Sequence, residues 1–199
     1  KGWDVLRYSY AASFGVDVWE YSDEQTRECS NYLANFNAVA VRERSAVELC
    51  ADKFNISANH VLDPTMLLSQ EDYLSLIPLN SPRYDGQIMT YLLDQTDAKM
   101  HLVNLIEKET GYKSFSTKSP SYSENITELI VPPVERWIQG FRDANLIITD
   151  SFHACVFSII FKKPFLVLIN SDRGATRFKS LLKLYNLEDR ILRSNQILT

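Results

Sequence analysis

One histidine and one arginine stand where the sequence favours anion-binding chemistry. His153 closes the run Asp150-Ser151-Phe152-His153, which links the apolar residues 146–149 to a second, longer apolar run. Arg42 directly follows another apolar run, residues 38–41. Imidazole exchanges protons near neutral pH, and a guanidinium pairs well with carboxylate or phosphate. These residue types predict a site for a small polyanion, and no metal site is predicted.

His153 is expected in the first turn of a helix over residues 152–161. Asp150 or Ser151 can cap this helix, and Asp150 can alternatively orient His153. Backbone N–H groups and the helix dipole attract anions at such a position. The alternative is a histidine that packs in the core or serves only as a cap.

Other strand ends carry comparable residues. Ser13 follows the first predicted strand, and Arg173 and Arg177 follow the last one. We predict that Arg42, His153, Arg173 and Arg177 face one cleft. The alternatives are a solvated Arg42 paired with Glu43 or Glu48, a plain surface loop at 173–177, and a purely structural turn at Asp63-Pro64-Thr65.

Strands and helices alternate along the chain, which predicts α/β structure with parallel sheets. We expect strands at 5–10, 38–41, 60–62, 88–93, 112–115, 146–149 and 165–169. We expect helices at 24–35, 71–77, 98–110, 134–141, 152–161 and 178–185, and one that Ser45 and Glu48 open as a capping box. Gly111 is expected to cap the helix 98–110.

Turn-forming residues at 79–86 predict a boundary between two domains. Residues 81–199 contain enough elements for a complete α/β domain. Residues 1–80 hold only three strands, so we expect them to be the C-terminal half of another domain.

Composition excludes several classes of protein. Among 199 residues, 45% are hydrophobic and the net charge is −4, so a nucleic-acid partner is not expected. The longest apolar run is too short to span a bilayer. Three cysteines without paired spacing favour a reducing cytoplasm over a disulfide framework. Residue 1 is Lys, so a preceding targeting segment stays an open alternative.

Five segments together resemble the polysaccharide pyruvyl transferase family: YSYAASFG, AVAVRERSA, VLDPTMLL, ANLIITDSFHACVFSIIFKKPF and RGATRFKSLLKLYNLEDRIL. The resemblance extends over about residues 6–192 and is most specific at Thr-Asp-Ser-Phe-His. Many members have Gly-Thr where this chain has Ala154-Cys155. The resemblance implies two Rossmann-like domains facing a cleft, similar to B-type glycosyltransferases, with residues 1–80 in the first domain and 81–199 in the second.

The resemblance also implies a reaction. Phosphoenolpyruvate, as co-substrate, would give its pyruvyl group to a sugar or a lipid-linked oligosaccharide as a ketal, without a cofactor, in the synthesis of a surface polysaccharide. His153 would be the general acid or a phosphate ligand, with Asp150 beside it. Arg42, Ser13, Ser151, Arg173 and Arg177 would bind substrate. A lipid-linked acceptor would bring a cytoplasmic enzyme to the inner face of the membrane.

Two other functions stay open from the sequence. A B-type glycosyltransferase would share the anion site but needs a ribose-binding carboxylate, which the sequence does not indicate. A non-catalytic carbohydrate-binding relative would not need Arg42 and His153.

Overall fold

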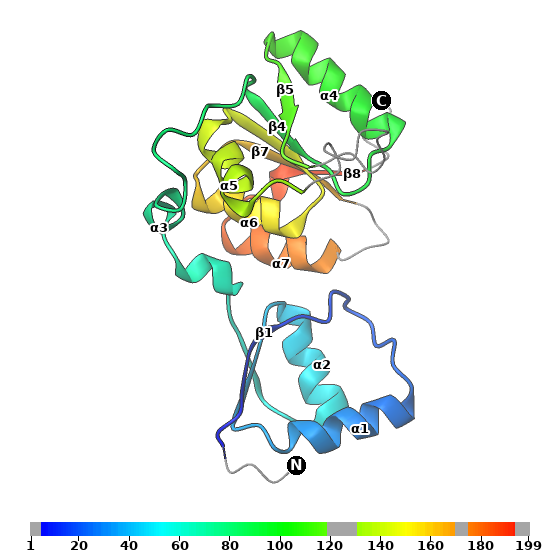
Figure 1. Cartoon of the computed structure of the whole chain (residues 1–199). Helices are drawn as coiled ribbons and strands as arrows, with labels where there is room; N and C mark the ends of the chain where they lie inside the picture. The colour runs from blue at the N-terminus through cyan, green and yellow to red at the C-terminus, as the bar shows by residue number, and fades with distance from the viewer. Residues whose placement is uncertain (1–4, 119–130, 170–174, 194–199) are drawn as a thin grey trace. The chain divides into compact units, whose positions relative to one another are not determined.

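The computed structural model describes residues 5–118, 131–169 and 175–193. The chain forms two compact units (Figure 1). Unit 1 groups Lys1–Leu67 with Asp172–Glu188, and unit 2 groups Leu68–Ser171 with Asp189–Thr199. The sequence predicted one boundary at residue 80. In the structure, the first part of unit 1 ends at Leu67, and unit 1 also includes the later segment Asp172–Glu188.

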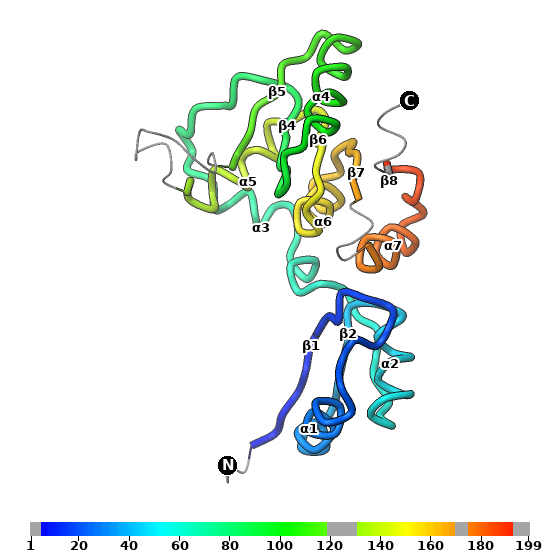
Figure 2. Tube along the Cα trace, turned by 90° about the vertical axis from the view of Figure 1, so that its right-hand side faces the viewer, coloured from blue at the N-terminus to red at the C-terminus, as the bar shows by residue number. Residues whose placement is uncertain are grey.

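Unit 1 contains a three-stranded parallel sheet in the order β1-β2-β3. Its elements along the chain are β1 (Tyr8–Ala12), α1 (Asp23–Leu33), β2 (Ala38–Val41), α2 (Arg44–Phe54), β3 (Ala58–His60), the 3-10 helix Pro64–Leu67 and α7 (Ala175–Leu184). Figure 2 shows β1 and β2 side by side with α2 next to them. Val41, Ala46 and Cys50 form the centre of the core between α2 and the sheet.

Helix α2 begins two residues before the position that the sequence predicted. Its N-cap is Glu43, and Ser45 lies inside the helix with a buried hydroxyl, so the predicted capping box of Ser45 and Glu48 is wrong. The sequence does not determine the cap residue, because the polar residues Glu43, Arg44 and Ser45 are consecutive. The backbone puts the first of them at the cap, and its side chain bonds Ser13 instead of capping the helix.

Unit 2 contains a five-stranded parallel sheet in the order β5-β4-β6-β7-β8. Its elements are α3 (Gln70–Leu74), β4 (Ile88–Tyr91), α4 (Asp97–Thr110), β5 (Ser114–Ser116), α5 (Val134–Asp143), β6 (Leu146–Thr149), α6 (Phe152–Ile160), β7 (Phe165–Ile169), the 3-10 helix Glu188–Arg190 and β8 (Ile191–Arg193). The predicted parallel α/β class is confirmed in both units, and the pattern is compatible with a Rossmann-like fold. The short strand β8 was not predicted.

The strand order reverses between β4 and β6. Strand β4 pairs with β5 on one side and with β6 on the other. The connection from β4 to β5 therefore leads to one side of β4, and the connection from β5 to β6 crosses back to the other side. Open α/β sheets bind ligands beyond the carboxyl ends of the strands at such a switch point. The residues after Tyr91 and after Thr149 therefore lie at the preferred ligand position of unit 2.

Helix α4 covers one face of this sheet. Ile88, Ile148 and Leu168 point to that face and form a core cluster with Val103 of α4, all of them nearly inaccessible to solvent. A threonine N-cap opens α4, and Gly111 closes it in the left-handed conformation, as the sequence predicted.

Helices α5 and α6 pack on the other face (Figure 1). Gly140 of α5 lies so close to the sheet that an added Cβ would stand 2.9 Å from Met89 Sδ. The rings of Trp137 and Phe141 contact Phe157 of α6. These ring contacts join the middle of α6 to α5.

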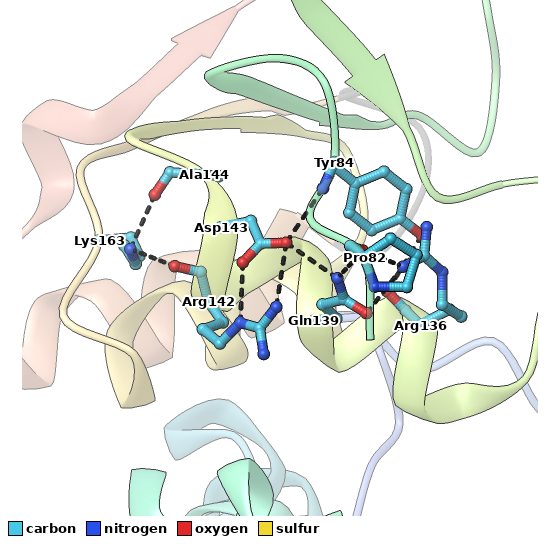
Figure 3. Close-up of polar contacts among 8 residues, drawn as sticks. All are labelled: Pro82, Tyr84, Arg136, Gln139, Arg142, Asp143, Ala144 and Lys163. Atoms are coloured by element: carbon cyan, nitrogen blue, oxygen red, sulfur yellow. Dashed lines mark hydrogen bonds and ion pairs between the residues drawn. The ribbon is translucent and has the colours of Figure 1, made fainter. Parts of the chain in front are cut away.

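A polar network ties the segment before β4 to α5 (Figure 3). Asp143 accepts hydrogen bonds from Tyr84 N (3.2 Å), Gln139 Nε2 (3.0 Å) and Arg142 Nε (2.8 Å). Gln139 is fully buried and also donates to Pro82 O at 2.6 Å. Burial alone would raise the pKa of Asp143, but the Arg142, Gln139 and Tyr84 hydrogen bonds outweigh it and lower the pKa below its ordinary value.

Among the described residues, no helix combines the length and the apolar character that crossing a bilayer requires.

Candidate functional site

Six residues of unit 1 lie at the carboxyl ends of its strands and bond there in two groups, Ser13 with Glu43, and Arg42 with His60, Asp63 and Thr65. We call them the arginine cluster: Ser13, Arg42, Glu43, His60, Asp63 and Thr65. Parallel strands bring these positions together because each strand ends at the same edge of the sheet.

Arg42 and Asp63 form an ion pair at the centre of the arginine cluster. Arg42 Nη1 contacts Asp63 Oδ2, and the two side chains are 17% and 2% exposed. The other carboxylate oxygen, Oδ1, accepts hydrogen bonds from Thr65 N at 3.0 Å and Thr65 Oγ1 at 2.7 Å. Arg42 is thus mostly buried and paired with a buried aspartate from the next strand end, which differs from the alternative of a solvated arginine.

Glu43 is the most deeply buried charged residue of the arginine cluster. It is inaccessible to solvent, and its Oε1 accepts a hydrogen bond from Ser13 Oγ. Within the described residues, Oε2 has no hydrogen-bond partner. The bond between Ser13 and Glu43 ties the segment after β1 to the start of α2.

The second group lies at the switch point of unit 2. We call it the histidine cluster: Leu93, Asp94, Lys99, Asp150, Ser151 and His153. Asp150 accepts hydrogen bonds from Leu93 N at 2.6 Å and Asp94 N at 3.2 Å. Lys99 Nζ lies 2.5 Å from Asp150 Oδ2 and 3.0 Å from Asp94 O. Asp150 thus joins the residues after β6 to the loop after β4.

Ser151 is the cap of α6. Its Oγ accepts from Ala154 N at 3.5 Å, and its own N–H donates to Thr149 Oγ1 at 3.0 Å. Of the two residues predicted as caps, Ser151 takes the role, and the side chain of Asp150 turns to the β4–α4 loop instead.

His153 is exposed, although the residues on both sides of it are buried. Its ring stands edge-on to the ring of Phe152, 5.6 Å away between centroids. The alternative of a histidine packed in the core is therefore wrong. An exposed imidazole in the first turn of a helix can hold an anion or donate a proton to it.

The neighbouring thiol does not offer a nucleophile. Burial raises the pKa of Cys155 to about 12, and burial also raises the pKa of Cys50. Both stay protonated near neutral pH, and a protonated thiol is a poor nucleophile. Neither buried thiol is therefore a good candidate for covalent catalysis.

Comparison with known proteins decides the family. The family model described as polysaccharide pyruvyl transferase matches residues 3–172, which is most of the chain. The chain belongs to the polysaccharide pyruvyl transferase family. Membership places it in a transferase family whose name implies a polysaccharide acceptor.

A curated relative of this pyruvyl transferase family member is General stress protein 30 of Bacillus subtilis (strain 168). The two are 26% identical over 163 residues, which cover 78% of this chain and 45% of the relative. The chain thus spans less than half the length of that protein.

The remaining predicted site residues of this pyruvyl transferase family member fall in different places. Ser13 is half-buried and bonded to Glu43. Arg177 is the half-buried third residue of α7. Arg173 lies outside the described residues. That Arg42, His153, Arg173 and Arg177 face one cleft stays a prediction.

Two residues that the sequence did not single out are central to these clusters. Asp63 was read as part of a turn, although its place after a strand end was a usable signal. Lys99 gave no signal, because a lysine in the first turn of an amphipathic helix normally points to solvent. Only the folded chain shows that its ammonium group reaches back to Asp150.

Proposed function

We propose that the full-length protein transfers the pyruvyl group of phosphoenolpyruvate to two hydroxyls of a sugar, forming a ketal. The observation that supports this most is an oriented arginine in a pyruvyl transferase family member. Arg42 is paired with the buried Asp63 at the end of a parallel strand. The exposed His153 provides a second group suited to an anion at the start of α6.

The reaction balances as follows. A proton adds to the methylene carbon of the enol phosphate and makes it a methyl group, which leaves cationic character on the adjacent carbon. One sugar hydroxyl attacks that carbon and loses its proton. The bond from the carbon to the phosphate oxygen breaks, phosphate leaves, and the second hydroxyl closes the ketal with loss of its own proton.

Each residue has a role in this proposal. His153 donates the proton or binds the phosphate, since imidazole is the side chain whose charge changes near neutral pH. Arg42 clamps the carboxylate or the phosphate. Asp150 holds the β4–α4 loop beside the start of α6, so it acts through position. Ser13, Ser151, Arg173 and Arg177 complete the substrate contacts.

We propose two Rossmann-like domains facing a cleft, as in B-type glycosyltransferases, and chemistry that uses no cofactor. We further propose a cytoplasmic enzyme. A lipid-linked sugar acceptor would bring it to the inner face of the membrane.

The test uses full-length protein with carbon-13-labelled phosphoenolpyruvate and candidate acceptor sugars. Nuclear magnetic resonance should show a labelled ketal methyl group together with release of phosphate. His153→Gln should lower the rate ~10²–10⁴-fold, the usual cost of losing a positioned acid. Because His153 is exposed, this substitution should change the free energy of unfolding of the protein by less than about 1 kcal/mol.

His101→Gln is the matched control, because His101 is an exposed histidine on α4. It should behave as wild type in both measurements. Turnover of a nucleotide sugar without use of phosphoenolpyruvate would replace the proposal with a glycosyltransferase. No turnover of either donor, with binding of the sugar alone, would indicate a carbohydrate-binding relative.

A further inference from the structure

We propose that Asp63 is a positioning residue that orients the guanidinium of Arg42 toward the anion of phosphoenolpyruvate. This inference rests on the proposed function and assigns a role to a residue outside the predicted site. Asp63 is 3% exposed and belongs to the segment after β3, whereas Arg42 follows β2. The pair therefore joins two strand ends.

The local turn fixes the carboxylate of Asp63 independently of Arg42. Asp63 Oδ1 accepts from both the N–H and the hydroxyl of Thr65. The 3-10 helix starts at Pro64, and Met66 N donates to Asp63 O at 2.9 Å. Proline restrains its own backbone, so this turn is rigid. Oδ2 consequently points to Arg42 because Oδ1 is bound within the turn.

The backbone of Arg42 is fixed as well. Arg42 N donates to Ala12 O at 2.9 Å, and His60 Nε2 donates to Arg42 O at 3.0 Å. The last residues of β1 and β3 thus hold Arg42 at its main chain, while Asp63 holds the tip of its side chain. A long, flexible arginine side chain is in this way restricted before any substrate arrives.

This arrangement suits anion binding. A guanidinium carries five N–H donors in one plane, and a single carboxylate takes at most two of them. Pairing with Asp63 therefore sets the direction of the plane and remains compatible with a second anion. Ordering the side chain in advance reduces the entropy that substrate binding must otherwise overcome.

The experiment measures the dissociation constant of phosphoenolpyruvate by calorimetry, together with KM and kcat, on full-length protein. The variants are Asp63→Asn, Arg42→Ala and the double mutant. We expect Asp63→Asn to weaken binding about tenfold or more, in line with the cost of a misplaced binding group. The double mutant should bind no more weakly than Arg42→Ala alone, because Asp63 acts only through Arg42.

Asp52→Asn is the matched control, since Asp52 is an exposed aspartate on α2 of the same unit. It should bind phosphoenolpyruvate as wild type does. If Asp63→Asn does not fold, Thr65→Val tests the positioning role of Asp63 in its place. It removes the hydroxyl bond to Oδ1 alone and should weaken binding by a smaller factor in the same direction.

The outcomes separate the two proposals. Wild-type protein that neither binds nor consumes phosphoenolpyruvate would remove the proposed function, and the role of Asp63 with it. If Arg42→Ala abolishes binding while Asp63→Asn and Thr65→Val bind as wild type, the proposed function survives and the positioning role is overturned. An equal loss from Asp63→Asn with and without Arg42 would also overturn it, since it would show an independent effect.

Discussion

The two units each contain a buried aspartate paired with a cation, but one pair restrains a side chain and the other restrains the main chain of a loop. In unit 1, Asp63 contacts the tip of Arg42, a residue that itself stands at a strand end. In unit 2, Asp150 stands at the strand end, and Lys99 reaches it from helix α4. Both aspartate side chains are nearly inaccessible, at 2% and 5% exposure.

The remaining bonds of each carboxylate explain the difference. Asp150 accepts two backbone N–H groups of the β4–α4 loop, and Lys99 also binds the carbonyl of Asp94 in that loop. The pair of Asp150 and Lys99 therefore fixes the main chain of the β4–α4 loop. Asp63 is itself fixed by its own turn, so its pair with Arg42 fixes a side chain. The same ion-pair chemistry restrains a loop in unit 2 and the side chain of Arg42 in unit 1.

Removing the cation of the unit 2 pair should have the largest effect on stability. Lys99→Met leaves Asp150 buried without a cation, a change that typically costs about 3–5 kcal/mol. Urea unfolding should measure the loss. Lys108→Met, at an exposed lysine of the same helix, is the control and should stay within about 0.5 kcal/mol. If Lys99→Met were as mild as the control, the pair would not stabilise the loop.

Thiol labelling can locate the damage in one unit or the other. Cys50 lies in the core of unit 1 and Cys155 in that of unit 2, and burial raises the pKa of both thiols. In a Cys29→Ser background, which removes the exposed cysteine, labelling requires local opening. Lys99→Met should speed labelling of Cys155 about tenfold or more and leave Cys50 nearly unchanged.

Arg42→Met should produce the reverse pattern, with faster labelling of Cys50. Mass spectrometry after timed exposure to iodoacetamide distinguishes the two cysteines. Equal acceleration of both thiols in either variant would show that the two pairs do not stabilise their units separately.

A smaller effect is expected at Asp143, which anchors the segment before β4. Its pKa is depressed in the folded state, so its contribution is present above the unfolded pKa of about 3.9 and is lost as pH falls through the folded value. Asp143→Asn should cost about 1.5–3 kcal/mol near neutral pH, the scale of hydrogen bonds to a charged group. It should also flatten the fall in stability below about pH 4, as unfolding at several pH values would show. An unchanged acid profile would contradict this role.

The sequence predicted the parallel α/β class and most elements because apolar runs alternate clearly with helical patterns. Strands β2, β6 and β7 begin and end at the predicted residues. The short β8 was missed because three residues give too little pattern. Strand order could not be derived, since the switch between β4 and β6 depends on long-range packing rather than on local sequence.

The candidate site was predictable only in part. Arg42 and His153 could be singled out because each follows an apolar run that ends at a strand terminus. The partners Asp63 and Lys99 depend on contacts between residues 21 and 51 positions apart in the chain. No local pattern encodes such a contact, and this is why Asp150 was assigned to His153 or the helix cap rather than to the β4–α4 loop.

The most direct test of the role assigned to Arg42 is a titration of phosphoenolpyruvate into full-length protein by calorimetry. Wild type should bind, and Arg42→Lys should bind about tenfold more weakly or worse, because lysine lacks the planar fork that Asp63 orients. Arg44→Lys, at an exposed arginine two residues away, should bind as wild type does. Equal binding by wild type and Arg42→Lys, or the same loss of binding in Arg44→Lys, would contradict this role.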